Sequence, residues 1–248
     1  MPETLTVEVK AGMANRLRAF VSAMCLAEDL AVNLQIVWSA NDPACMARFE
    51  TLFDVTKLPD WVTVIMAPVP ANSTEVLSPE DLELWLSKPP TPIHSYGHFY
   101  QKDPQRWLNH LRAIKPHPLI RIPVVSPMTV GVHIRRGDHI KAKINSPIKA
   151  FIEAIQQEPK YTQFIVATDS MTEREALQVL FGERVTFPAT TISRMTQNGM
   201  MNAVSDFIAL SLCCKIYGSY ASSFSELAAL YGGVQLHVIK TKSTVDVS

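Results

Sequence analysis

The sequence predicts an α/β protein made of two parallel-sheet halves that face each other across a cleft. Short apolar runs alternate with segments of helical periodicity, the pattern of parallel strands connected by helices. The chain contains two such series of strands and helices. The prolines between Pro116 and Pro127 interrupt regular structure between the first series and the second. With 248 residues, 47% of them hydrophobic, the chain is long enough to bury two small cores. We therefore expect one domain over residues 1–120 and a second over residues 121–248.

The first half opens with a strand, a helix and a second strand. Leu17, Phe20, Val21 and Met24 share one face of the first helix. After the third strand, the proline-rich stretch of residues 68–123 leaves room for only two further helices. The expected strands are residues 5–9, 34–38 and 62–67, and the expected helices are residues 15–30, 79–87 and 103–114.

The second half alternates strand and helix more regularly, which is typical of a doubly wound sheet. Ala176, Leu177, Leu180 and Phe181 recur at helical spacing, and Gly182 is the expected stop. The expected strands are residues 129–134, 163–167, 184–187, 215–217 and 235–239, and the expected helices are residues 147–157, 172–181, 203–213 and 223–231.

Composition argues against several classes of protein. Lys and Arg number 23, as do Asp and Glu, a balance that argues against nucleic-acid binding and against broad binding to anionic membranes. No run reaches the roughly eighteen apolar residues of a membrane span, and the first residues lack a secretory signal. We expect a cytoplasmic protein without an integral membrane segment. Cys25, Cys45, Cys213 and Cys214 show neither disulfide nor metal spacing, so we expect reduced cysteines in the core.

A pair of arginines follows the first strand of the second half. Residues 130–138 read VGVHIRRGD, so Arg135 and Arg136 stand at the carboxyl end of a strand, where open α/β sheets bind ligands. Two guanidiniums at one place suit a diphosphate. The alternative is a solvated surface loop. Only one acid, Asp138, accompanies the basic residues of this stretch, which are Arg135, Arg136, Lys141, Lys143 and Lys149.

Two more strand ends carry polar residues expected at the same sheet edge. Asp169 could accept hydrogen bonds from ribose hydroxyls or base nitrogens, or else Asp169 or Ser170 caps the next helix. Ser223 and Glu226 have the spacing of a capping box. A helix amino terminus with hydroxyls beside it also favours a phosphate, so both roles can coexist.

The loop after the first strand, residues 10–18, contains a single glycine, Gly12. One glycine is too few for a dinucleotide-binding loop of the G-x-G-x-x-G type. Asn15, taken alone, is best explained as a helix N-cap.

Taken in order, four segments resemble motifs of the fucosyltransferase superfamily, which includes α1,6- and protein O-fucosyltransferases. The segments are Gly12 with Asn15 and Arg16, residues 133–138 (HIRRGD), residues 167–169 (ATD) and residues 222–225 (SSFS). Their span covers most of the chain. The resemblance implies two Rossmann-like domains of the GT-B type in a compact version, a GDP-fucose donor, inversion of the anomeric carbon and no metal or other cofactor.

The resemblance also implies roles for single residues. Arg135 would contact the diphosphate, Asp169 would help hold the nucleoside, and Asn15 would project into the cleft from the other domain. The expected donor-binding residues are His133, Arg135, Arg136, Asp169, Asp206, Ser222, Ser223 and Phe224. The expected catalytic residues are Arg135, Asn15 and Asp138.

The chemistry of the residues agrees with transfer from a glycosyl diphosphate. Negative charge grows on the leaving diphosphate, and fixed arginines with a helix amino terminus can stabilise it without a metal ion. The chain contains no D-x-D pair, so a metal-dependent mechanism is not favoured. The base that would deprotonate the acceptor is less clear, because Lys143 stands where the α1,6 branch has a glutamate. Asp138, His139 and Asp42 are alternatives, as is an oxocarbenium-like route with little base assistance.

These observations predict an inverting, metal-independent glycosyltransferase that transfers fucose from GDP-fucose to a glycan or another small or exposed hydroxyl acceptor. One alternative is a catalytically inactive nucleotide-sugar-binding protein, since the glutamate is missing, and another is a transferase using a different GDP-sugar. A third takes residues 136–138 (RGD) as an adhesion tripeptide, which neither a signal peptide nor a disulfide framework supports.

Overall fold

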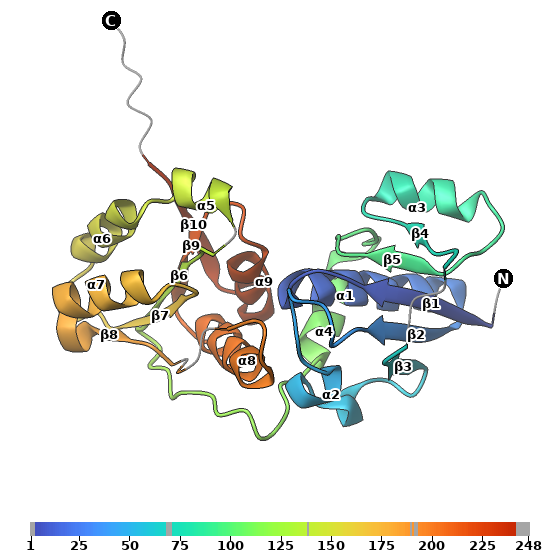
Figure 1. Ribbon diagram of the computed structural model, residues 1–248, viewed down its shortest axis with the longest axis horizontal. Coiled ribbons are helices and arrows are strands. Elements are labelled where there is room, and N and C mark those ends of the chain that lie inside the picture. The colour runs from blue at the N-terminus through green and yellow to red at the C-terminus, as the bar shows by residue number, and fades with distance from the viewer. Residues whose placement is uncertain (1–2, 68–70, 138, 189, 191–192, 242–248) are drawn as a thin grey trace, which may run out of the picture. The chain divides into compact units, whose positions relative to one another are not determined.

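The computed structural model describes residues 3–67, 71–137, 139–188, 190 and 193–241. The chain divides into unit 1, which comprises Met1–Ile120 and Arg194–Met201, and unit 2, which comprises Arg121–Ser193 and Asn202–Ser248. Each unit has a five-stranded sheet in which every strand pairing of the described residues is parallel (Figure 1). The predicted pair of Rossmann-like α/β folds is therefore confirmed.

The sheet of unit 1 has the strand order β3-β2-β1-β5-β4. Its strands are β1 (Thr4–Val9), β2 (Asn33–Trp38), β3 (Val62–Ile65), β4 (Thr74–Glu75) and β5 (Ile93–Ser95). All three strands expected in this half are present. β4 and β5 were not predicted, because two or three residues are too few to show a pattern and each forms only against its neighbour in the sheet.

The helices of unit 1 enclose an aromatic core. They are α1 (Met13–Leu30), α2 (Phe49–Leu52), α3 (Pro79–Leu86), α4 (Pro104–Ala113) and the 3-10 helix η1 (Val55–Lys57). The rings of Phe20, Trp38, Phe49 and Phe53 lie fully buried, with neighbouring centroids 5.2–6.2 Å apart. These rings place the end of β2 against α1 and α2, which fixes the start of the loop after β2.

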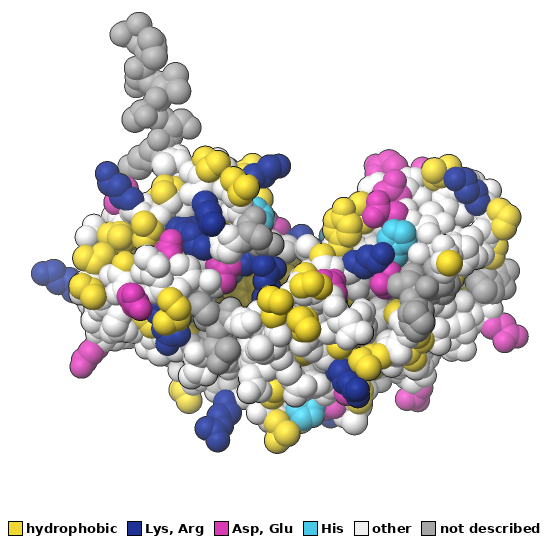
Figure 2. All heavy atoms as spheres, in the orientation of Figure 1, with side chains coloured by type: hydrophobic (Ala, Val, Ile, Leu, Met, Phe, Trp, Pro, Cys, Tyr) yellow, Lys and Arg dark blue, Asp and Glu magenta, His cyan; other side chains and the backbone are white. Residues whose placement is uncertain are grey.

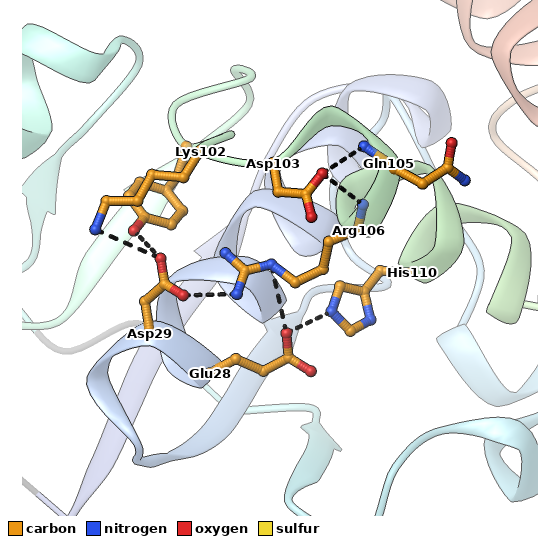
Figure 3. A network of polar contacts seen from close by, with 8 residues as sticks. Glu28, Asp29, Lys102, Asp103, Gln105, Arg106 and His110 are labelled. Atoms are coloured by element: carbon orange, nitrogen blue, oxygen red, sulfur yellow. Dashed lines mark hydrogen bonds and ion pairs between the residues drawn. The ribbon is translucent and has the colours of Figure 1, made fainter.

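Polar contacts join the end of α1 to the first turns of α4 (Figure 3). Nη1 of Arg106 lies 2.6 Å from one carboxylate oxygen of Asp29, and the other oxygen accepts a hydrogen bond from the Tyr100 hydroxyl. His110 and Glu28 form a second contact of 2.9 Å. The hydrogen bonds from Arg106 and Tyr100 lower the pKa of Asp29 to about 2. Asp29 therefore stays ionised at neutral pH, and the ion pair holds α4 on α1.

The sheet of unit 2 has the strand order β10-β9-β6-β7-β8. Its strands are β6 (Val130–Ile134), β7 (Phe164–Thr168), β8 (Val185–Thr186), β9 (Lys215–Ser219) and β10 (Gln235–Ile239). Every residue of the central strand β6 is buried. The chain builds the sheet outward from β6 first on one side and then on the other. Such a reversal opens a crevice at the carboxyl ends of the two strands beside it, here β6 and β9.

The helices of unit 2 agree with the sequence except at two places. They are α5 (Ile140–Asn145), α6 (Ile148–Gln157), α7 (Met171–Phe181), α9 (Ser223–Gly232), the 3-10 helix η2 (Gly182–Arg184) and α8 (Gln197–Ser211), which belongs to unit 2 from Asn202 onward. α8 begins before its expected start at residue 203, because Asn198 and Gly199 are weak helix formers that hid its first turn. α5 was missed because six residues are too few to show helical periodicity.

The expectation that all four cysteines lie in the core is wrong for one of them. Cys25, Cys45 and Cys213 are buried, and burial raises the pKa of each thiol to about 11 or 12. Cys214 is exposed. Within the described part of the chain, no helix is both long enough and apolar enough to cross a membrane.

Close packing of α9 on α8 generates a prediction about stability. A Cβ at Gly232 would lie 1.9 Å from the carbonyl oxygen of Ser211, a backbone atom that cannot move aside freely. Gly232→Ala should therefore lower the free energy of unfolding by about 1–3 kcal/mol. The control is Gly12→Ala, where the nearest atom is 3.8 Å away and the cost should stay below about 1 kcal/mol. Equal midpoints for the two variants in urea unfolding would contradict this packing.

Candidate functional site

The loop that follows β6, called here the arginine loop, starts with Arg135, Arg136 and Gly137 at the carboxyl end of the strand, where the crevice of the unit 2 sheet is expected. The backbone N–H of Arg135 donates to the hydroxyl of Ser219 at 2.9 Å, and that hydroxyl donates to the carbonyl of His133 at 3.2 Å. Ser219 is the last residue of β9, so one side chain ties together the ends of the two strands that flank the reversal. The loop is thereby fixed at the place where this fold binds ligands.

Asp169, directly after β7, holds the arginine loop from the other side. One of its carboxylate oxygens forms an ion pair with the guanidinium of Arg135, and the other accepts the backbone N–H of Arg136 at 2.6 Å. Gly137 makes room for this contact: its φ is +23°, and a Cβ there would lie 2.8 Å from the Asp169 carboxylate. Ser170, not Asp169, is the N-cap of α7, so the capping role considered for Asp169 falls to its neighbour.

The two arginines pair with different carboxylates, Arg135 with Asp169 and Arg136 with Glu173. Nε of Arg136 donates to Glu173 at 2.6 Å, and its guanidinium lies over the ring of Phe151, 6.0 Å from the centroid. Burial alone would raise the pKa of Glu173, but hydrogen bonds from Ser170 and Arg136 hold that pKa below its usual range. No described residue accepts a hydrogen bond from the buried Nη2 of Arg136. Arg136 therefore belongs partly to the core of unit 2, whereas the side chain of Arg135 is 16% exposed beside it.

His133 lies inside the sheet edge and is electrically neutral. Its ring stacks on Phe224 with centroids 4.8 Å apart, and its Nδ1 lies 3.3 Å from the hydroxyl of Ser222. Burial, followed by the charge of Arg135, lowers the pKa of His133 to about 3. The imidazole adds no positive charge at neutral pH, so it can only stack or exchange a hydrogen bond there.

The amino terminus of α9 follows β9 and is left without a side-chain cap. The predicted capping box of Ser223 and Glu226 does not form, because Ser222 is the N-cap and its hydroxyl points to His133 instead. Because no described side chain caps them, the first N–H groups of this ten-residue helix are available to an anion. Phe224, in the same turn, contacts the ring of Phe207 with centroids 5.7 Å apart.

Asp206, expected as a donor-site acid, is a buried residue of α8. It immediately precedes Phe207, whose ring is edge-on to Phe224. The structure thus brings the candidate residues of unit 2 to one region, around the carboxyl ends of β6, β7 and β9. These residues are His133, Arg135, Arg136, Asp169, Asp206, Ser222, Ser223 and Phe224.

Asn15 belongs to unit 1 and is not the N-cap of α1. The helix begins at Met13 with Gly12 as its N-cap, so Asn15 lies inside the first turn, half-buried. The explanation of Asn15 as an N-cap is therefore wrong. No described residue forms a hydrogen bond with its side-chain amide.

Arg16, which the sequence marked only as part of a motif, is the structural centre of this loop. It is fully buried and donates to the carbonyls of Ala11 at 2.8 Å and Ser39 at 2.6 Å. Its third contact, 3.0 Å long, is with the carboxylate of Asp42. Arg16 thus connects the loop after β1 to the loop after β2. The sequence analysis missed this role, because only the fold shows that the guanidinium is buried with three partners.

The alternative bases have other contacts or lie outside the description. Asp42 is ion-paired with Arg16, and Nδ1 of His139 accepts the backbone N–H of Ala142 as the N-cap of α5. Lys143 is exposed to solvent. Asp138 lies outside the described residues.

No protein-family profile matches the chain, and no curated protein matches its sequence. Solved structures do match. NodZ α1,6-fucosyltransferase, a Bradyrhizobium enzyme, soaked with GDP-fucose is 18% identical with a TM-score of 0.62, and the match covers 92% of each chain. POFUT1 in complex with GDP is 12% identical with a TM-score of 0.60, over 96% of this chain and 99% of that one.

A third similar structure is an Arabidopsis thaliana FUT1 variant in complex with GDP. It is 12% identical with a TM-score of 0.61, over 94% of this chain and 69% of that one. At these identities the similarity establishes a shared fold, the GT-B fold with two Rossmann-like domains. The superfamily whose motifs the sequence resembles is thus the one whose solved structures share this fold.

Burial of His133 predicts a pH dependence of stability. Between pH 6.5 and about 3 the unfolded chain binds a proton at this residue that the folded chain does not. The free energy of unfolding should therefore fall as pH falls through this window, by up to about 1 kcal/mol per pH unit. His133→Gln removes the titrating group and should flatten the profile. Urea unfolding at several pH values measures the free energy of unfolding of the native protein and of the variant. If the two pH profiles are parallel, His133 is not the residue that causes the pH dependence.

The contact between Asp169 and Arg135 predicts an energetic coupling. Asp169→Asn keeps the size of the side chain and removes its charge, so Arg135→Ala should cost less stability in that background than in the native protein. We expect a coupling energy of about 1–2 kcal/mol from the double-mutant cycle measured by urea unfolding. The control pairs Arg135→Ala with Arg48→Ala, a change of an exposed residue of unit 1, and these two changes should be additive. A coupling near zero for Asp169 and Arg135 would refute the loop-holding role.

Proposed function

We propose that this protein transfers fucose from GDP-fucose to a hydroxyl of a glycan or another acceptor, with inversion of the anomeric carbon and without a metal ion. One observation carries the proposal. The arginine loop and the amino terminus of α9, which no described side chain caps, both follow the neighbouring strands β6 and β9, where the strand order of the unit 2 sheet reverses. Solved structures of the same fold were obtained with GDP and with GDP-fucose, which supports this donor.

The diphosphate would be held by charge that is fixed before the donor arrives. Arg135 supplies a guanidinium whose position Asp169 sets, and the N–H groups at the start of α9 supply a positive helix end. Nη2 of Arg136 is a further donor of the same loop that a phosphate oxygen could satisfy. Donors that need no reorganisation stabilise the charge that develops on the leaving diphosphate.

The nucleoside would lie beside the His133 and Phe224 rings. Stacked rings with a hydroxyl, Ser222, next to them offer one apolar face and a few hydrogen-bonding groups, as nucleoside pockets generally do. Asp206 would act as an acid of this pocket, and Ser223 would contribute its N–H at the helix end. Asp169 would act mainly through Arg135 rather than by direct contact with the ribose.

The transfer step would break the bond between the anomeric carbon and the phosphate oxygen. The acceptor oxygen forms its bond to that carbon from the opposite face, which inverts the configuration, and the bonding electrons leave with the diphosphate. Asp42 and His139 have structural contacts, so neither is a free base. The proposal therefore takes an oxocarbenium-like route with little base assistance, and it keeps Asn15 and Asp138 as catalytic residues.

A second candidate is a nucleotide-sugar-binding protein without transfer activity. The observation in its favour is the exposed Lys143 at the position where the α1,6 branch carries a glutamate. A third is a transferase that uses a different GDP-sugar, because contacts to a diphosphate do not identify the sugar. Release of GDP from GDP-fucose and from other GDP-sugars, with and without acceptor glycans, distinguishes the three candidates. The proposed enzyme releases GDP from GDP-fucose, a transferase for a different sugar releases it from another GDP-sugar, and a binding protein releases it from none.

Arg135→Ala should weaken GDP binding by about tenfold or more, because it removes a charge-assisted contact worth roughly 1.5–3 kcal/mol. Isothermal titration calorimetry measures the effect. The control is Arg48→Ala, an exposed arginine of unit 1 whose nearest carboxylate, Glu50, is 3.7 Å away, and it should leave the affinity unchanged. An equal affinity for the Arg135 variant and the native protein would refute the diphosphate site.

Transfer should persist in EDTA, because arginine and helix N–H groups supply the charge that a metal ion would otherwise supply. The measurement is GDP release from GDP-fucose before and after chelation, with a known manganese-dependent transferase as the positive control. Loss of activity that manganese restores would overturn the metal-independent mechanism.

A further inference from the structure

The short helix α5 places two isoleucines in solvent a few residues after the arginine loop. Ile140 and Ile144 are each 69% exposed, while Ala142 on the opposite side of the helix is fully buried. At about 100° per residue, the two isoleucines lie on one face, with Lys141 on one side of them and Lys143 on the other. Both lysines are exposed. The outer face of α5 is therefore an apolar stripe bordered by cations.

A third lysine lies at the same edge of the sheet. The backbone N–H of Thr241 donates to the carbonyl of Asn145, the last residue of α5, at 3.0 Å, which places Lys240 next to the helix. Nζ of Lys240 lies 4.9 Å from the ring centroid of Tyr220, whose backbone N–H donates to the C-cap residue of α5, Ser146, at 2.8 Å.

These residues form one basic and apolar surface, called here the α5 surface: Ile140, Lys141, Lys143, Ile144 and Lys240. Residues 139–149 contain no Asp or Glu, and no described carboxylate forms an ion pair with the three lysines. Figure 2 shows hydrophobic and basic side chains together over the place that α5 occupies in Figure 1. The balanced charge of the whole chain thus conceals a local cationic patch.

We propose that the α5 surface docks the protein on membranes that carry anionic lipids, with Ile140 and Ile144 inserted at the headgroup level. Lysines that border an apolar stripe on a helix are typical of helices lying in the membrane interface, where the cations contact lipid phosphates. Such a helix lies on the bilayer and does not span it.

A protein partner fits this surface less well. A stable protein interface buries roughly 800 Å² on each partner, with a continuous apolar centre. The apolar part of the α5 surface consists of two isoleucines on a six-residue helix. A soluble polyanion would contact the lysines but leave both isoleucines in water. A lipid surface satisfies both kinds of side chain.

Docking of α5 does not depend on the proposed transfer reaction, because it can be measured without a donor. If the transfer reaction also holds, docking would keep the end of β6 close to the headgroups, and the acceptor would be carried by a lipid or by a membrane-bound molecule.

The test is co-sedimentation of the full chain with vesicles of phosphatidylcholine, with or without phosphatidylglycerol. We expect binding to the mixed vesicles that weakens with added salt, and little binding to phosphatidylcholine alone. The double variant Lys141→Glu/Lys143→Glu should bind at least about tenfold more weakly, since each lysine contributes near an anionic surface. The double variant Ile140→Ser/Ile144→Ser should also lose about tenfold in affinity through lost apolar burial.

Matched controls change the same residue types elsewhere on unit 2. Val179→Ser alters a side chain on α7 that is 84% exposed, and Lys160→Glu reverses a charge before the start of β7, at the opposite end of the strands. Both should bind mixed vesicles like the native chain, and every variant should keep its melting temperature.

Three results would overturn the proposal. One is the absence of binding to mixed vesicles, and the second is unchanged binding of either α5 double variant. The third is retention on immobilised heparin without binding to vesicles, which would assign the lysines to a soluble polyanion.

Discussion

The contact between Asp169 and the arginine loop is the interaction on which the candidate site depends. One carboxylate receives both the Arg135 guanidinium and the Arg136 backbone N–H, at the edge where β6 and β7 end. The positive charges of two adjacent arginines repel each other. Asp169 offsets that repulsion and fixes Arg135 before any ligand is present, as a site needs in order to stabilise charge without reorganising.

The other residues of the loop act on the same geometry. Gly137 keeps the Asp169 carboxylate within reach, Ser219 anchors the Arg135 N–H, and Glu173 draws Arg136 toward the core. In unit 1, the buried guanidinium of Arg16 has a comparable role, because its contacts fix the start of α1. Each unit thus contains a buried or partly buried ion pair that shapes a loop at a strand end, where the fold binds ligands.

Local patterns in the sequence were sufficient to predict the long strands, most helices and the position of the arginine loop at a strand end. They could not predict which side chains meet across the sheet. Ser222 rather than Ser223 is the N-cap residue of α9, and Ser170 rather than Asp169 caps α7, because tertiary contacts with His133 and Arg135 decide both. The two-residue strand β4 likewise forms only through pairing with β5, which no local periodicity reveals.

The most direct test of the central claim is a map of backbone amide chemical shifts as GDP is added to the isotopically labelled protein. The account predicts the largest changes at Arg135, Gly137, Ser223 and Phe224, around the carboxyl ends of β6 and β9 in unit 2. Changes confined to unit 1, or spread evenly over the protein, would contradict the placement of the nucleotide site at the arginine loop.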